Sequence, residues 1–317
     1  MYAARGANSP GSFAGQIARP IGQLPLASLG MESNARRLWK LLEPIHAVGY
    51  FSPEPIGLLK EAGYRGYWMG YFAARSAPLG AVPAEVVHAV FYNFAFSHVS
   101  RALPDAWTYA PPEAADKARR AGAVAALRRH LGPLADSDDL IRAASLASRA
   151  ALGAPPEGRA LYAALRSLPV SDDLLTLLWD SATLLREHRG DGHVATLLAA
   201  GIGGRESHVF HALANGTSPS VYATSRNIHE TEWDSLVSGL QSRGLVTDAG
   251  QSLTDAGRET KAGIESTTDA LAATAYATLE PAEIDELIAL LRPLAKAVVA
   301  SGEIPGQSPM GLNFDDI

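Results

Sequence analysis

The sequence predicts a mainly α-helical protein in which two copies of one helical unit are arranged about a pseudo-two-fold axis. Apolar residues recur every three or four positions along most of the chain, which is the spacing of amphipathic helices. Two stretches are also similar to each other at a constant offset of 138 residues. The matching pairs are Leu59 and Leu197, Ala62 and Ala200, Gly63 and Gly201, and Gly66 and Gly204. An internal duplication of this kind favours an arrangement like a fused dimer.

The N-terminal part of the chain contains an extension followed by the first repeat. Residues 1–30 are rich in Gly, Ser, Pro and Ala and contain no apolar run of signal-peptide length, so we expect a disordered extension. Met31 begins the first amphipathic pattern, which places the first repeat at 31–135. Within this repeat we expect a third element over Pro83–Leu103 and a long helix over Pro112–Leu131.

A helical connector is expected between the two repeats, and a further helix after the second. The connector covers 136–169, the second repeat 170–275, and the C-terminal helix with its tail 276–317. A long helix over Thr254–Ala273 should end the second repeat. The apolar stripe within Pro281–Gly302 predicts that the C-terminal helix packs against other helices.

The second repeat contains the order helix, strand, turn, strand, helix. Trp233, Val237 and Leu240 share one face of a helix that Gly244 ends. The two short strands expected on either side of a turn at 248–250 are Leu245–Thr247 and Gln251–Thr254. This order resembles the winged helix of the MarR-type regulators, down to the phrase RGLV–LT–AGR. The resemblance implies a MarR-like winged helix here, and the duplication implies a winged-helix-like unit in the first repeat.

The chain is also similar, over residues 31–312, to an actinobacterial helix-turn-helix family. The phrases that carry this similarity are PIHAVGYFSPE (44–54), GYRGYWMGYFAARSAPLG (63–80), VFYNFAFSHVSRALPDAW (90–107), LREHRGDGHVATL (185–197) and RGLV–LT–AGR (243–258). The resemblance implies a helix-turn-helix scaffold and specifies no substrate.

The charges at the expected DNA-facing positions argue against tight DNA binding. A DNA-binding protein neutralises phosphates with Lys and Arg, and this supplies much of its affinity. Here the helix begins with Glu230, Glu232 and Asp234, and the turn carries Asp248 without a basic residue. These carboxylates should repel a phosphate backbone. We therefore do not expect DNA as a partner, although a basic helix at 117–129 leaves one positive segment.

The composition restricts the classes of function further. The net charge is −6 and the pI is about 5.9, whereas nucleic-acid-binding domains are usually basic. Cysteine is absent, which excludes disulfides, thiolate metal sites and cysteine nucleophiles. The sequence has no apolar span of membrane-crossing length, no nucleotide-binding glycine motif and no zinc-type histidine spacing. We therefore expect a cytoplasmic protein with no cofactor and no metal.

The densest polar cluster is the run REHRGDGH at 186–193, which is interpreted as a loop between two apolar helices. In an enzyme, His188 and His193 could transfer protons and Glu187 could orient an imidazole. His188 is the preferred candidate because it precedes a Gly-x-Gly turn. A structural interpretation is also open: the two glycines would end one helix, and the aspartate between them would cap the next.

A second cluster combines aromatic and polar side chains: His46, Tyr50, Phe51, Glu54, Tyr67, Trp68, Tyr71 and Arg75. Trp68, Tyr71 and Arg75 share one helix face. Such a stripe is often core, yet buried hydroxyl and guanidinium groups each need a partner, and aromatic walls with a few polar groups are typical of ligand pockets. Residues 91–94, which include Tyr92, could form another wall or pack in the core.

These patterns together predict a small-molecule-binding protein on a winged-helix scaffold with little or no DNA binding. The expected ligand is aromatic or polycyclic, and it lies in a pocket between the repeats. The expected binding residues are His46, Tyr50, Trp68, Tyr71, Arg75, Tyr92 and Arg186. Two alternatives remain open at this point: a MarR-like transcriptional regulator, and an enzyme of specialised metabolism that uses residues 186–193. We expect a monomer or a homodimer.

Overall fold

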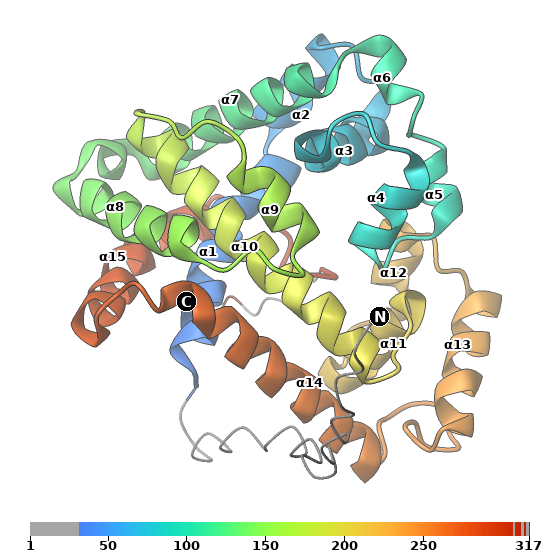
Figure 1. Ribbon diagram of the computed structural model, residues 1–317. Helices are drawn as coiled ribbons and strands as arrows, with labels where there is room; N and C mark the ends of the chain where they lie inside the picture. The colour runs from blue at the N-terminus through green and yellow to red at the C-terminus, as the bar shows by residue number, and fades with distance from the viewer. Residues whose placement is uncertain (1–31, 307, 312–313, 315–316) are drawn as a thin grey trace, which may run out of the picture. The chain divides into compact units, whose positions relative to one another are not determined.

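Helices dominate the part of the chain that the structure describes (Figure 1). The computed structural model describes residues 32–306, 308–311, 314 and 317, so the extension predicted at 1–30 lies outside the described residues. The α-helices are α1 (Asn34–Phe51), α2 (Pro53–Glu61), α3 (Gly66–Ser76), α4 (Ala84–Phe91), α5 (Phe96–Ser100), α6 (Ala106–Tyr109), α7 (Pro112–Leu131), α8 (Asp138–Gly153), α9 (Ala160–Arg166), α10 (Leu174–Ala199), α11 (Gly204–Asn215), α12 (Pro219–Arg226), α13 (Glu230–Ser242), α14 (Asp255–Ala273) and α15 (Pro281–Ala300). Three short 3-10 helices are η1 (Ala77–Leu79), η2 (Gly132–Asp136) and η3 (Thr274–Tyr276). The mainly helical class is confirmed.

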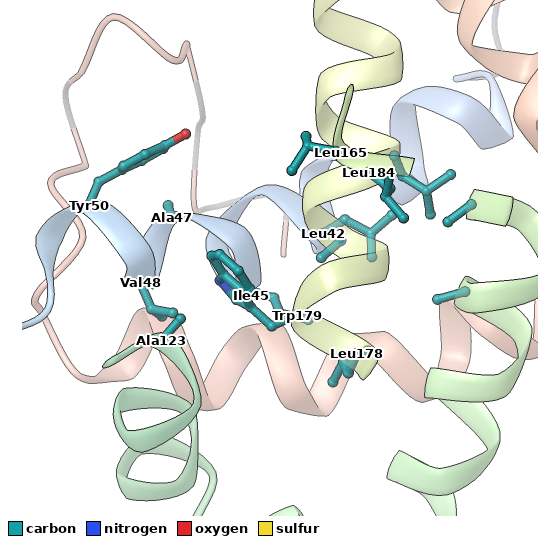
Figure 2. Close-up of a cluster of buried hydrophobic side chains, with 14 of the residues drawn as sticks. Leu42, Ile45, Ala47, Val48, Tyr50, Ala123, Leu165, Leu178, Trp179 and Leu184 are labelled. Carbon is teal, nitrogen blue, oxygen red and sulfur yellow. The ribbon is translucent and has the colours of Figure 1, made fainter. Parts of the chain in front are cut away.

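The larger core lies where α1, α7, α8, α10 and α15 pack against one another. Leu42 and Ile45 of α1 gather with Leu178 and Trp179 of α10, and Ala123 of α7 completes this group (Figure 2). Each large aliphatic side chain buried in this way contributes about 1.5–3 kcal/mol. The helices predicted at Pro112–Leu131 and within Pro281–Gly302 are both confirmed, and the apolar stripe of the second faces this core as expected.

Glycine permits the close contact between α2 and α7. A Cβ atom on Gly122 would lie 2.3 Å from the Cα atom of Pro55, which is too close for any side chain. The α2 helix therefore packs closely on α7. It also contacts α3, the helix that carries Tyr67, Trp68 and Tyr71.

The segment from α11 to α14 has a second, smaller core of its own. Phe210, Tyr222, Trp233, Leu240 and Ile264 are all buried there. The α11 helix contacts α12, α13 and α14, while α14 also packs on α1 and α10. The face that the sequence predicted for α13 is thus confirmed, and α14 links the small core to the large one.

The wing is smaller than the sequence predicted. Only Val246 and Leu253 form a β-bridge in the described part of the chain, in place of two strands. Thr247 N–H donates to the Ser252 carbonyl at 3.0 Å, and a second backbone bond closes the ladder next to it. The predicted strands at 245–247 and 251–254 are therefore wrong in extent. The physical reason is that a two-stranded ribbon of this length, without a third strand, is marginally stable.

The run at 186–193 is not a loop, and this corrects the sequence interpretation. It lies inside α10, a continuous helix of 26 residues. The α10 helix packs against α1, α7, α8, α9 and α14, and this packing outweighs the cost of about 1 kcal/mol for each glycine in a helix. Gly192 is needed because Arg159 Nη1 would lie 2.6 Å from a Cβ atom there. Asp191 accepts two N–H groups from the first turn of α9, each at 3.0 Å, and does not cap its own helix.

The two predicted repeats differ at one element. The first repeat has two short helices over Pro83–Leu103, where a single third element is expected, because α4 ends where Tyr92 adopts a φ of 56°. Residues 32–135, all of them described, form no β-bridge. The duplication, its pseudo-two-fold axis and the domain boundaries remain predictions. Residues 33–317 form one compact unit.

Candidate ligand-binding cavity

A cavity of about 1200 Å³ lies between α3, the helix that carries Tyr67, Trp68 and Tyr71, and the segment from α11 to α14. Side chains from α1, α3, α10, α11, α12 and α14 line it, together with residues of the C-terminal tail. The structure brings six of the seven predicted ligand-binding residues to its walls: Tyr50, Trp68, Tyr71, Arg75, Tyr92 and Arg186. These residues are far apart in the sequence and come from four different segments.

Aromatic rings form one wall of the cavity. The Tyr71 ring centre lies 5.5 Å from that of Trp68, 5.7 Å from that of Phe94 and 5.1 Å from that of Tyr50. Tyr67 stacks on Tyr71 with 6.1 Å between ring centres. Tilted and edge-to-face pairs of this kind hold the rings in place. Trp68 and Tyr71 are only partly buried, so part of each ring remains available at the cavity surface.

A buried carboxylate on α10 holds two guanidinium groups at the cavity wall. Arg75 donates from Nε and Nη2 to the two oxygens of Glu187, each at 3.1 Å. Arg186 Nη1 donates to Glu187 Oε2 at 2.7 Å, and its Nε donates to Glu43 Oε1 at 3.4 Å. The Trp39 indole donates to the other Glu43 oxygen at 3.0 Å. Two arginines and two glutamates thus neutralise one another along this wall.

The paired groups Glu187 and Arg186 stay ionised at neutral pH. Burial by itself would raise the pKa of Glu187, but the adjacent Arg186 and Arg75 charges hold this pKa well below its usual range. Burial likewise opposes the charge on Arg186, yet the two glutamates raise its pKa well above the usual value. A carboxylate held this firmly in its charged form is a poor proton acceptor, which disfavours Glu187 as a general base.

His46 lies behind the cavity wall and does not reach the cavity surface. Its Nε2 is 2.8 Å from the Tyr50 hydroxyl, and its Nδ1 is 2.9 Å from Thr183 Oγ1. Burial, reinforced by the nearby Arg186 charge, lowers the pKa of His46 well below its usual value. His46 is therefore neutral and holds the Tyr50 ring in position, so its expected role as a direct ligand contact is corrected.

Tyr92 joins the aromatic wall to the start of α11. Its hydroxyl donates to the Ile202 carbonyl at 2.5 Å. A Cβ atom on Gly204, the first residue of α11, would lie 2.1 Å from the Tyr92 carbonyl oxygen. The end of α4 is thus packed directly against the start of α11, and this contact closes one side of the cavity.

His188 does not face the cavity, which corrects the expectation for the preferred histidine. Its side chain is buried, with its ring 5.0 Å from the ring of Tyr162. Glu187, the preceding residue of α10, lines the cavity, whereas His188 does not. His193 does line the cavity, and its Nδ1 is 2.9 Å from Thr268 Oγ1. Burial lowers the pKa of His193 to about 4, so it is neutral at pH 7.

Sequence reasoning missed several charged residues of the cavity, among them Glu43 and Arg226. Glu43 interrupts the apolar run LLEPI on α1, and a buried charge there requires a partner. A charged residue within an apolar run could therefore have indicated a buried ion pair at Glu43. Arg226 ends α12 in an otherwise ordinary polar segment, and only the tertiary contacts place it at the cavity.

The surfaces that could meet DNA carry little free positive charge. The exposed face of α13 consists of Glu230, Thr231, Asp234, Ser235, Ser238 and Ser242. Glu232, expected to be free, pairs with Arg205 Nε at 2.7 Å. On the basic helix α7 most arginines are paired or buried: Arg119 is 3% exposed, and Arg120, Arg128 and Arg129 pair with Asp180, Asp136 and Glu54.

Within the described ranges, no group of three or more His, Asp or Glu side chains is arranged to hold a metal ion. Over the same ranges, every helix is too short or too polar to span a bilayer.

A helix-turn-helix family matches residues 35–305, and the chain belongs to this family. The match runs from α1 through the cavity to the residues that follow α15. No curated protein and no solved structure matches the chain significantly. The helix-turn-helix part of the resemblance noted in the sequence is thereby confirmed.

Proposed function

We propose that this protein binds an aromatic or polycyclic small molecule in the cavity between α3, α10 and α12, and that it binds DNA weakly or not at all. The observation that carries the proposal is the cavity itself. Its volume of about 1200 Å³ exceeds the usual range for ligand sites, about 300–1000 Å³. A ligand with several rings would fill such a space better than a small metabolite.

The lining supports an aromatic ligand. Trp68 and Tyr71 offer partly exposed rings against which a flat ligand can pack. The ion cluster around Glu187 supplies fixed polar groups at the cavity wall, and such groups orient a ligand. In the free protein these groups form ion pairs with one another, so they are already fixed in position before the ligand binds.

A fluorescent probe tests the proposal directly. Phenylnaphthylamine, a neutral aromatic amine, becomes bright in an apolar site, and we expect saturable binding with one site per chain. Trp68→Leu should weaken this binding about tenfold, because an aromatic pair contributes about 0.5–1.5 kcal/mol beyond its buried area. The control is Phe96→Leu, since Phe96 is exposed and lies outside the cavity. The same probe affinity in both variants and the wild type would contradict the proposal.

Membership of the helix-turn-helix family favours one second candidate, a ligand-responsive DNA-binding regulator. The exposed acidic residues of α13, Glu230 and Asp234, weigh against it because phosphates are bound by cations. Fluorescence anisotropy with random-sequence and genomic duplexes at low salt distinguishes the two. Nanomolar binding that falls steeply with salt would support the regulator and contradict weak DNA binding.

A further inference from the structure

Arg226 is held rigidly at the cavity by its surroundings. It is the last residue of α12, and its guanidinium carbon lies 4.3 Å from the centre of the Phe94 ring. The following residue, Asn227, ends the helix with a φ of 53°. Arg205 fixes this turn by donating to the carbonyls of Arg226 and Asn227 at 2.8 and 3.2 Å. Because Arg205 is itself paired with Glu232, the backbone that carries Arg226 has little freedom.

The other cationic side chains of the cavity have carboxylate partners. The pairs are Arg36 with Glu265 and Asp269, Arg75 with Glu187, Arg186 with Glu43 and Glu187, Arg189 with Asp269, Arg258 with Asp255, and Lys261 with Glu265. Arg226 differs from them. Over the described residues no carboxylate pairs with it, its Nε is buried without an acceptor, and its Nη1 donates only to the neighbouring Ser225 carbonyl.

This leaves an uncompensated positive charge beside the aromatic wall. Burial lowers the pKa of Arg226 to about 10, and the Arg75 charge acts in the same direction. At neutral pH the group is nevertheless protonated. Arg226 is only partly buried, but its Nε is shielded from water and has no acceptor, and an unpaired charge shielded in this way is destabilising. An anion placed next to the guanidinium would compensate it. The unpaired Arg226 charge therefore makes an unfavourable contribution to the free energy of the ligand-free protein, and an anionic ligand would remove it.

We infer that the ligand of this cavity is an anionic aromatic compound whose carboxylate, sulfonate or phosphate group binds the guanidinium of Arg226 while its rings pack on Trp68 and Tyr71. The inference rests on the proposed function and specifies the ligand class. Arginine suits this role because its planar fork can donate two parallel hydrogen bonds to such a group. Phe94, beneath the guanidinium, keeps it oriented without neutralising it.

Two probes with one ring system separate the anion from the rings. Anilinonaphthalene sulfonate carries a sulfonate that its neutral parent, phenylnaphthylamine, lacks. In the wild type we expect the sulfonate to bind about ten- to a hundredfold more tightly, as expected for hydrogen bonds between charged groups. Each probe should displace the other, which shows that they share one site.

Arg226→Gln should abolish this preference and leave the affinity for the neutral probe within about twofold. Arg226→Lys should restore part of it. The matched control is Arg258→Gln, because Arg258 lies at the same cavity but is mostly exposed and paired with Asp255. Without any probe, Arg226→Gln should melt at the same or a higher temperature than the wild type, since it removes an unpaired charge. A merely structural arginine would give a lower melting temperature.

The outcomes separate the two ideas. If the wild type binds the neutral probe as tightly as the sulfonate, the inference is overturned and the proposed function stands, and this measurement needs no variant. If Arg226→Gln keeps the preference for the sulfonate, the anion binds elsewhere and the inference is again overturned. If neither probe binds with saturation, the proposed function fails and the inference fails with it.

Discussion

Glu187→Gln is the substitution with the largest effect that we expect at the cavity. The carboxylate is 2% exposed and accepts three hydrogen bonds from the guanidinium groups of Arg75 and Arg186. A glutamine keeps the shape and one acceptor oxygen but removes the negative charge. Arg75 then has no counter-charge, and Arg186 retains only its longer contact with Glu43.

The magnitude follows from leaving a buried charge unpaired. Breaking a buried pair by removing one partner costs about 3–5 kcal/mol, and the acceptor kept by glutamine places this variant near the lower end of that range. The pKa of Glu187 is depressed in the folded state, so its contribution is fully present above the pKa of an unfolded glutamate, about 4.3. It is lost as the pH falls through the lower folded-state pKa. The difference between variant and wild type should therefore be constant at neutral pH and shrink in acid.

Urea denaturation at pH 7 and at pH 4 measures this difference in the free energy of unfolding. The control is Glu259→Gln, because Glu259 is an exposed residue of α14 and its charge should contribute little. A loss below about 1 kcal/mol for Glu187→Gln at pH 7, the size of a single neutral hydrogen bond, would refute the view that this carboxylate neutralises both arginines.

Three further outcomes are expected. Gly122→Ala should lower the free energy of unfolding by about 1–3 kcal/mol, because the added methyl group forces α7 away from Pro55. Gly263→Ala, which lies in open space on α14, should raise it by about 0.5–1 kcal/mol. Equal effects of the two substitutions in urea denaturation would contradict the packing argument. Burial raises the pKa of Asp191 to about 6, so its carboxyl group should contribute about 2 kcal/mol less to stability at pH 7 than at pH 4, and thermal melts should show this as a change in the stability difference between the wild type and Asp191→Asn over that range. His188→Leu should leave the affinity for phenylnaphthylamine unchanged, since the ring packs outside the cavity; a large loss of binding in a folded variant would return His188 to the site.

The sequence determined the class of the fold and many of its helices. Helical periodicity located α7, α13 and α15 closely, because their buried faces repeat with the helix and their ends carry proline or glycine. The spacing of Trp68, Tyr71 and Arg75 also indicated a shared face, and that face reaches the cavity. These features are local, since each depends on residues within a few turns of one another.

The tertiary structure decided the rest. Glycines at 190 and 192 predicted a break, but α10 continues through them because helices pack around it, and a Cβ atom on Gly192 would meet Arg159. The partners of charged residues were also beyond the sequence, since Arg75 and Glu187 are separated by 112 positions. Whether an arginine is paired depends on what the fold places beside it. Arg226 therefore acquires its place in the cavity, and its lack of a counter-charge, only when α12 packs against the aromatic wall.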